Sequence, residues 1–245
     1  MRVPTDTPPA SVSPPRQVLV LGASASFGPD LVRGFVARNA RVLATTRSGN
    51  RAGFAPAVEV AALDLMDAES QDRFIRNVLP PFGKLDIAVF LAGVLPGKAL
   101  DAYDDALMQR VMDTNFTGQA ALLRRLLPHF TAGAQVWLLS SISGDRGSFD
   151  PVYAASKAAL VGFVKSLATW LAPGLRVNAL APGVIEDSAM FAAMAPERRA
   201  AHVSATPTGR LTTAAEVAAV IISLCEPAWA NLNGQVIRLN GGAYV

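Results

Sequence analysis

The chain has 245 residues, of which 51% are hydrophobic, so it is long and apolar enough to bury the core of one ordinary domain. Its 22 basic and 19 acidic side chains leave a net charge of +3, and no basic run or aromatic-interleaved basic stripe indicates a nucleic-acid partner. The single cysteine and the two widely separated histidines exclude an internal disulfide and a structural zinc site.

The first 16 residues are rich in proline and lack the apolar stretch of a secretion signal. We predict a disordered extension over residues 1–16 and a folded domain over residues 17–245. Every long apolar stretch is interrupted by a charged residue or a proline, so no membrane span is expected. The predicted location is the cytoplasm.

The predicted domain begins with an apolar, β-branched run at residues 17–21 that indicates a buried strand. A glycine-marked turn at 22–28 and a helical pattern follow it directly. A strand, a turn and a helix in this order are the context that a dinucleotide phosphate loop requires, because the helix N-terminus offers free N–H groups to a pyrophosphate. The glycines alone are weak support, since their pattern is incomplete.

Strands and helices alternate along the rest of the chain. Further strands are predicted at 41–46, 58–63, 85–91, 134–139, 175–180 and 235–239. Helices are predicted at 68–79, where two prolines end the pattern, at 99–130 with an interruption at 115–118, at 153–171 and at 217–224. This alternation predicts a single-domain α/β fold with a doubly wound, mostly parallel sheet of seven strands and helices on both faces. Ligands of such sheets bind beyond the C-terminal ends of the strands.

Tyr153 and Lys157 lie four residues apart in a helical pattern and therefore share one face of the helix. A lysine ammonium beside a phenol stabilises the phenolate, so we expect a lowered pKa for Tyr153. A tyrosine with such a pKa can exchange a proton with a substrate oxygen. A surface Tyr–Lys pair has the same spacing, and an isolated Y-x-x-x-K pattern is more often such a pair.

Several motifs in order make residues 17–245 resemble the short-chain dehydrogenase/reductase family, and most of all its bacterial 3-oxoacyl-thioester reductases. The motifs are Y-A-A-S-K at 153–157, S-S-I-S-G at 140–144, D-T-N-F-T-G at 113–118, R-V-N-A-L-A-P-G-V-I at 176–185, and C-terminal segments at 209–217 and 233–242. Together they are far more specific than any one of them. The resemblance implies a Rossmann fold.

The resemblance implies four catalytic residues. Tyr153 would be the general acid when a carbonyl is reduced and the base in reverse, and Lys157 would lower its pKa and hold the nicotinamide ribose. Ser141 would hydrogen-bond the substrate oxygen. Asn115 would bend its helix and hold a water that feeds protons through Lys157. Ser140 is the alternative to Ser141, which is preferred because the family's serine usually lies three residues before the glycine of this motif.

The resemblance also implies a nicotinamide cofactor. Arg47 follows the second strand, where an acidic residue would favour NAD(H), so NADP(H) is the better prediction, with a merely solvated Arg47 as the alternative. Asp64 would pair with the adenine amino group. The other cofactor-binding candidates are Gly22, Ser24, Ser26, Phe27, Gly28, Leu65, Ala92, Gly93, Pro182, Gly183, Val184 and Ile185, together with Tyr153 and Lys157.

Three positions depart from the family pattern. Ser26 stands where the family usually has a glycine, and Leu91 stands where it has an asparagine. Asp187 takes the place of a threonine that binds the nicotinamide carboxamide, with Ser188 as a candidate substitute. These changes would weaken the cofactor site without touching the catalytic set.

The segment at about 186–207 corresponds to the family's substrate lid. Candidate substrate-binding residues are Ser143, Phe149, Met190 and Phe191. An apolar lining suits a ketone on an apolar or acyl skeleton, whereas a lid helix that packs its apolar stripe on the body would show the same pattern. An acyl carrier protein would need a basic rim, for which Arg146, Arg198, Arg199 and Arg210 are candidates.

The predicted function is that of an oxidoreductase, without a metal, that transfers hydride between NADP(H) and a carbonyl or secondary alcohol, possibly one carried on an acyl carrier protein or CoA. One alternative is a catalytically weak protein that senses the cofactor or serves as a scaffold; another is an isomerase or dehydratase that uses the same residues. The helices at 99–130 and 151–172 are expected to form a four-helix contact between subunits of a homodimer or homotetramer.

Overall fold

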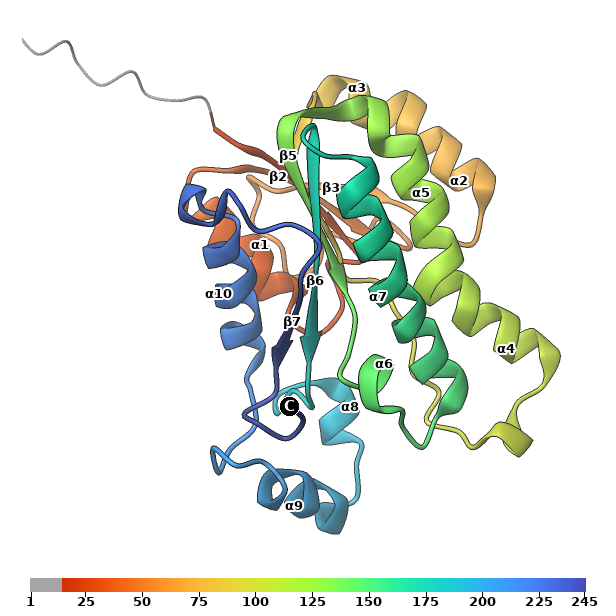
Figure 1. The fold of residues 1–245 in the computed structure, drawn as a ribbon. Helices are drawn as coiled ribbons and strands as arrows, with labels where there is room; N and C mark the ends of the chain where they lie inside the picture. Colours follow the sequence, from red (N-terminus) through yellow and green to blue (C-terminus); the bar gives the residue numbers. More distant parts are fainter. Residues whose placement is uncertain (1–14) are drawn as a thin grey trace, which may run out of the picture.

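The computed structural model describes residues 15–245, which form one seven-stranded sheet (Figure 1). All neighbouring strands are parallel, in the order β3-β2-β1-β4-β5-β6-β7. The strands are β1 (Gln17–Leu21), β2 (Arg41–Thr46), β3 (Glu59–Ala62), β4 (Leu85–Phe90), β5 (Phe130–Leu139), β6 (Leu175–Pro182) and β7 (Val236–Leu239). Because the strand order reverses between β1 and β4, a ligand crevice is expected at the C-terminal ends of these two strands.

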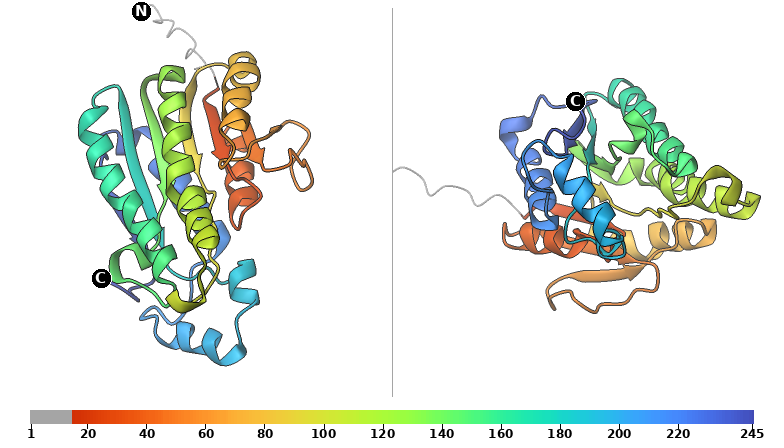
Figure 2. Two further views of the ribbon diagram at one scale, coloured as in Figure 1. Left: turned by 90° about the vertical axis from the view of Figure 1, so that its right-hand side faces the viewer. Right: turned by 90° about the horizontal axis from the view of Figure 1, so that it is seen from below.

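Helices cover both faces of the sheet, which confirms the predicted fold class. The helices α1 and α10 lie side by side on one face, and α2, α4, α5 and α7 lie on the other (Figures 1 and 2). Their bounds are α1 (Gly28–Val36), α2 (Ala68–Arg73), α3 (Leu79–Phe82), α4 (Asp105–Met112), α5 (Gly118–Leu126), α6 (Ser143–Arg146), α7 (Pro151–Trp170), α8 (Ala189–Ala192), α9 (Pro196–Ser204) and α10 (Ala214–Leu224). In Figure 1, β6 and β7 point toward α8 and α9, so these two helices of the predicted lid lie beyond the C-terminal edge of the sheet.

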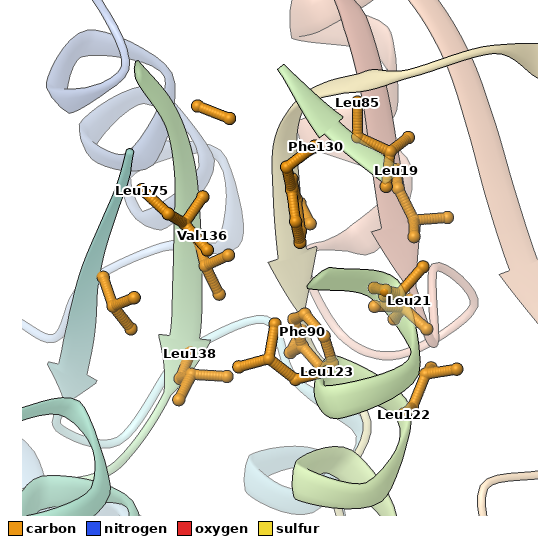
Figure 3. Close-up of a cluster of buried hydrophobic side chains, with 14 of the residues drawn as sticks. Leu19, Leu21, Leu85, Phe90, Leu122, Leu123, Phe130, Val136, Leu138 and Leu175 are labelled. Carbon is orange, nitrogen blue, oxygen red and sulfur yellow. The ribbon is translucent and has the colours of Figure 1, made fainter. Parts of the chain in front are cut away.

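The core consists of two apolar layers, one on each face of the sheet. Successive side chains of a strand point to opposite faces, and the β1 residues divide accordingly. Leu19 and Leu21 pack on the side of α5, near Leu122 and Leu123 (Figure 3). Val18 and Val20 pack on the side of α1 and α10. Burial on both faces explains why the strands read as continuous apolar runs rather than as alternating patterns.

Side-chain caps fix where several helices begin. Thr213 and Glu216 form a capping box at the start of α10, in which each side chain accepts a hydrogen bond from the other residue's backbone N–H (3.2 and 2.9 Å). Asp104 caps α4 by accepting from the backbone N–H of Leu107 at 2.7 Å. The helix predicted from residue 99 therefore begins only at residue 105, after a single 3₁₀ turn at Leu100–Ala102.

Two helical stretches contain a π-helical turn. The turn Phe74–Val78 joins α2 to α3, and helix continues to residue 82. The prediction that the prolines end this helix at residue 79 was therefore wrong, because Pro80 and Pro81 lie in the first turn of α3, where a backbone N–H is not needed. The second turn, Asp113–Thr117, joins α4 to α5 and accounts for the interruption predicted at 115–118. Strand β5 begins at residue 130, four residues earlier than predicted.

The extension predicted as disordered lies outside the described residues, apart from residues 15 and 16. Arg16 joins the start of β1 to the end of α10. Its guanidinium donates to the backbone oxygen of Cys225 at 2.8 Å and pairs with Glu226 at 3.0 Å. Within residues 15–245 the structure has no helix long and apolar enough to span a membrane.

Candidate active site

Four side chains predicted to be catalytic converge beyond the ends of β4 and β5. Lys157 is 3% exposed, and its Nζ donates to the backbone oxygen of Leu139, the last residue of β5, at 2.6 Å. The same Nζ lies 5.8 Å from the centroid of the Tyr153 ring. A Cβ placed on Gly93 would lie 3.4 Å from both Lys157 Nζ and Asn115 Oδ1, so these two groups face the chain at Gly93. Segments far apart in the sequence therefore meet at one point.

The structure gives the two candidate serines different surroundings. Ser140 is 2% exposed, and its Oγ donates to the backbone oxygen of Lys157 at 2.9 Å, so its hydroxyl ties β5 to α7. The hydroxyl of Ser141 instead lies close enough to Tyr153 to lower its pKa by hydrogen bonding, and it accepts from the backbone N–H of Ser143 at 3.1 Å. Of the two serines, only Ser141 acts on the tyrosine hydroxyl in this way, which favours it over Ser140 for the role at the substrate oxygen.

Burial is the main cause of the shifted pKa values of Tyr153 and Lys157. Burial raises the pKa of Tyr153 above its usual value, the hydrogen bond from Ser141 lowers it, and the negative charge of Asp150 raises it further. Burial also lowers the pKa of Lys157 to about 8. The expected lowering of the Tyr153 pKa by Lys157 was therefore wrong for this structure, because the loss of solvent around the phenol outweighs the attraction of an ammonium that is itself desolvated.

Asn115 occupies the centre of the π-helical turn between α4 and α5. It is fully buried, and its Oδ1 accepts from the backbone N–H of Val94 at 2.7 Å. Its Nδ2 donates to the backbone oxygen of Val94 and to the Oγ of Ser156, both at 2.9 Å. The side chain thus ties the loop after β4 to α7. The distorted helix agrees with the expected bend, and the proposed role in holding a water stays a prediction.

Gln119 supports this region, and the sequence interpretation missed it. The side chain is 1% exposed, and its Nε2 donates to the backbone oxygens of Ala92 (2.8 Å), Asn115 (3.0 Å) and Thr114 (3.2 Å). It therefore satisfies carbonyls that the π-helical turn displaces and binds the segment after β4, where the family's asparagine is replaced. A glutamine on the otherwise apolar buried face of a predicted helix is the signal that could have identified it.

We expect the variant Gln119→Leu to be destabilised. Removal of the amide leaves three backbone oxygens without this donor, so the free energy of unfolding should fall by about 2–4 kcal/mol. Urea unfolding followed by circular dichroism measures the change. Gln109→Leu is the matched control, because Gln109 is exposed on the preceding helix and should cost about 0.5 kcal/mol or less. Equal losses in the two variants would contradict the assigned role of Gln119.

A cavity of about 170 Å³ opens at the C-terminal ends of β1 to β4. The predicted cofactor residues that line it are Gly22, Ser24, Arg47, Asp64, Leu65, Ala92 and Gly93. The lining residues that were not among the predicted cofactor residues are Leu21, Ala25, Thr45, Thr46, Leu63, Met66, Val94 and Thr114. Most of these are direct neighbours of predicted residues, so the strand-end rule located the segments but not every side chain.

The residues around this cavity are of the kinds that bind a dinucleotide. Gly22 has a φ of +70°, and a Cβ on it would lie 2.9 Å from the backbone nitrogen of Ala92, so only glycine leaves the passage open. Arg47 stands exposed at the rim, and no hydrogen bond or ion pair among residues 15–245 engages its guanidinium. Asp64 lies just beyond the end of β3. Its carboxylate accepts from the backbone N–H of Met66 at 2.9 Å, which fixes its orientation.

The second half of the glycine turn does not line the cavity with side chains. Phe27 is 1% exposed and packs in the core beneath α1, so only its backbone is available to a ligand. A Cβ on Gly28 would lie 2.2 Å from the backbone oxygen of Ala23, so this glycine allows the helix to pack closely on the turn. Ser26 has a φ of +30°, a left-handed conformation that favours the glycine the family carries there.

The loop after β6 lies at a second, smaller cavity of about 50 Å³. Gly183 and Val184 line it, whereas Pro182 ends β6 and Ile185 bridges to Thr212. The Oδ1 of Asp187 accepts from the backbone N–H of Ala214 at 2.7 Å. The hydroxyl of Ser188 donates to the backbone oxygen of Ile185 at 2.7 Å and accepts from Phe191 N at 3.1 Å. Both candidates for the carboxamide contact are thus already engaged with the backbone.

The predicted substrate residues lie at different places around the C-terminal edge. Phe149 is 63% exposed and lies two residues before α7, and Met190 is 37% exposed in α8. Phe191 lies beneath the guanidinium of Arg199, at 5.9 Å from the ring centroid. The backbone N–H of Ser143 donates a hydrogen bond to the Oγ of Ser141. Within residues 15–245, no cluster of three or more histidine, cysteine, aspartate or glutamate side chains is arranged to hold a metal ion.

The chain matches a protein family and individual relatives over nearly the whole described region. The family described as enoyl-(acyl carrier protein) reductase matches residues 22–244. The 3-oxoacyl-(acyl-carrier-protein) reductase FabG of Salmonella typhimurium is 31% identical over 238 residues, which cover 93% of this chain and 96% of that protein. The FabG of Vibrio harveyi is 32% identical over 238 residues, with the same coverage.

Solved structures show the same similarity. A short-chain dehydrogenase/reductase from Brucella melitensis superposes with a TM-score of 0.87 at 28% identity, covering 94% of this chain and 97% of that one. One from Serratia marcescens superposes with a TM-score of 0.86 at 25% identity, covering 94% and 98%. With the family match, the relatives and the fold in agreement, this chain belongs to the short-chain dehydrogenase/reductase family of oxidoreductases.

Proposed function

We propose that the protein uses NADP(H) to reduce a ketone on an apolar or 3-oxoacyl-type substrate, with Tyr153 as the general acid. The observation that carries the proposal is the convergence of Ser141, Tyr153, Lys157 and Asn115 beside a cavity that a glycine keeps open. The relatives named 3-oxoacyl-(acyl-carrier-protein) reductase support the substrate class. The exposed apolar side chains of Phe149 and Met190 suit the same class.

The residues around the cavity would hold the cofactor, which supplies the hydride when bound. Gly22 and the turn after it would lie against the pyrophosphate, and Arg47 would bind a 2′-phosphate. Ser141 would orient the substrate oxygen by a hydrogen bond. The Tyr153 hydroxyl would then donate its proton to that oxygen as negative charge develops there. Lys157, whose pKa burial lowers to about 8, can return a proton to the phenolate near neutral pH.

A titration with NADPH, and a separate one with NADH, tests the cofactor half of this proposal. Quenching of tryptophan fluorescence should report tighter binding of NADPH, and purified protein should then oxidise NADPH in the presence of a 3-oxoacyl thioester. Tighter binding of NADH would overturn the cofactor assignment alone. If neither nucleotide binds, the departures at Ser26 and Leu91 outweigh the rest of the site, and the reductase proposal fails.

The rim of the site also supports a substrate carried on an acyl carrier protein or CoA. Arg210 is paired with Glu216 at 2.6 Å, so it is not free for an acidic partner. Arg146 and Arg198 lie close enough to His202 that, after burial, their charges lower its pKa. These two arginines on α6 and α9 are the candidates to meet an anionic carrier.

We further propose a homodimer or homotetramer formed through α5 and α7. These helices border a shallow apolar hollow of about 380 Å³, lined by residues that include Leu123, Phe163 and Trp170. Trp170 is 69% exposed, which is costly for so large an apolar side chain unless a second copy covers it.

Sedimentation velocity should therefore find particles of two or four chains, and Trp170→Glu should shift them toward the 25.7 kDa monomer. Trp229→Glu is the matched control, because Trp229 is 44% exposed but lies beyond α10, away from α5 and α7. A wild-type protein that sediments only as a monomer would contradict the proposed assembly.

A further inference from the structure

Asp150 is a buried carboxylate beside the catalytic tyrosine that the mechanism above does not use. Its side chain is 3% exposed, and it stands three residues before Tyr153. As the N-cap of α7, its Oδ1 accepts from the backbone N–H of Tyr153 at 2.9 Å. A capping residue at this place has no need of further partners, and a serine or an asparagine would perform the cap equally well.

The carboxylate of Asp150 nevertheless accepts three more hydrogen bonds, all from the loop after β4. The Tyr103 hydroxyl donates to Oδ1 at 2.7 Å, and the backbone N–H groups of Gly97 and Lys98 donate to Oδ2 at 2.9 and 3.2 Å. An ionised carboxylate has no proton to donate, so it can accept hydrogen bonds from all four donors at once. Asp150 therefore clamps this loop onto the first turn of α7.

The loop clamped by Asp150 also contacts the active site at its other end. Val94, the first residue of the 94–103 part of this loop, exchanges two hydrogen bonds with the side chain of Asn115. Between these two anchors the loop presents Leu95 and, further on, Leu100, which are 38% and 59% exposed. Phe149, which is 63% exposed, directly precedes Asp150. The clamp thus fastens a loop with exposed apolar side chains to the residue that directly follows Phe149, a candidate substrate-binding residue.

We propose that Asp150 is a positioning residue of this enzyme, which fastens the 94–103 loop onto the first turn of α7 as a wall of the substrate site. The role of the loop as a wall of that site rests on the function proposed above, whereas the clamp rests on the hydrogen bonds alone. A plain helix cap would predict no effect on the loop. The variants Asp150→Asn and Asp150→Ser preserve a capping side chain while removing the charge, so they separate the two roles.

Amide hydrogen exchange tests the clamp without requiring any activity. In Asp150→Asn and Asp150→Ser, the amide protons of Gly97 and Lys98 should exchange roughly tenfold faster or more, because each loses a charge-assisted hydrogen bond. The amides within α7 should keep their wild-type rates, since the cap remains. Unchanged exchange at both loop amides in the two variants would overturn the clamp. The serine variant keeps the test decisive should the asparagine variant fail to fold.

Steady-state kinetics of ketone reduction test the role of the loop in the substrate site. In Asp150→Asn the loop is no longer fastened to α7, so the KM for a 3-oxoacyl thioester should rise, whereas kcat should change less because Ser141, Tyr153 and Lys157 stay in place. Tyr103→Phe removes one hydrogen bond of the clamp, so it should raise the same KM by a smaller factor. An unchanged KM in a folded Asp150→Asn would overturn this role.

Failure of the proposed function would look different. If the wild-type protein reduces no ketone, the function proposed above fails, while amide exchange at Gly97 and Lys98 still tests the clamp independently of catalysis.

Discussion

The variant Tyr153→Phe is expected to lose carbonyl reduction while it retains cofactor binding. The ring and its packing remain, but the hydroxyl that would donate the proton and hydrogen-bond Ser141 is gone. Positioned general acids contribute about 10²–10⁴-fold to the rate, so kcat for reduction of a 3-oxoacyl thioester should fall by that factor. NADPH oxidation followed by absorbance measures the loss, and a parallel fluorescence titration should give an NADPH Kd close to that of the wild type.

Tyr244→Phe is the matched control for this variant. Tyr244 lies near the C-terminus, where its ring packs under the guanidinium of Arg238 at 5.4 Å, outside the catalytic set. Loss of the Tyr244 hydroxyl should leave kcat within about a factor of two, as expected for a surface substitution that costs roughly 0.5 kcal/mol or less. If Tyr153→Phe kept full turnover, the general-acid assignment would be wrong. If wild type and variant bound NADPH but neither turned over a carbonyl, the cofactor-sensing alternative would gain support.

The positions of the strands along the chain and the place of the site could be predicted because they depend on local patterns. Buried parallel strands are continuous apolar runs, and every predicted strand lies within a few residues of the observed one. The polar residues at the strand ends likewise located the cavity. A break at 115–118 was predicted, but its π-helical geometry was not, because that geometry depends on tertiary partners such as Val94 and Ser156, which the side chain of Asn115 binds.

The pKa values of Tyr153 and Lys157 were the property of the site that sequence spacing predicted least well. A four-residue interval places Lys157 and Tyr153 on one helix face, but it contains no information about how deeply that face is buried. Burial reverses the expected direction for the tyrosine and lowers the pKa of the lysine to about 8. The contribution of Asp150 could not be anticipated either, because its other partners come from a loop about fifty residues earlier.

Selectivity for NADPH should depend on Arg47, which stands at the end of β2 without a partner among residues 15–245. Charge-assisted hydrogen bonds to a phosphate are the strong ones, at roughly 1.5–3 kcal/mol each. Arg47→Ala should therefore weaken NADPH binding by about 10–100-fold, since about 1.4 kcal/mol corresponds to a factor of ten. NADH lacks the 2′-phosphate, so its affinity should change little. Fluorescence titrations with both nucleotides, at one fixed ionic strength, measure the ratio.

A second arginine of the same loop separates specific contact from a general effect of charge. Arg51 donates to the backbone oxygen of Val58 at 2.8 Å and does not line the cavity. Arg51→Ala removes the same charge nearby, so it should lower NADPH affinity only slightly, and less so at high salt. Equal losses for NADPH and NADH in Arg47→Ala would show that the arginine does not read the 2′-phosphate. The choice between the two cofactors would then have to be made elsewhere along the rim, where polar side chains at the adjacent strand ends include Thr45, Thr46 and Asp64.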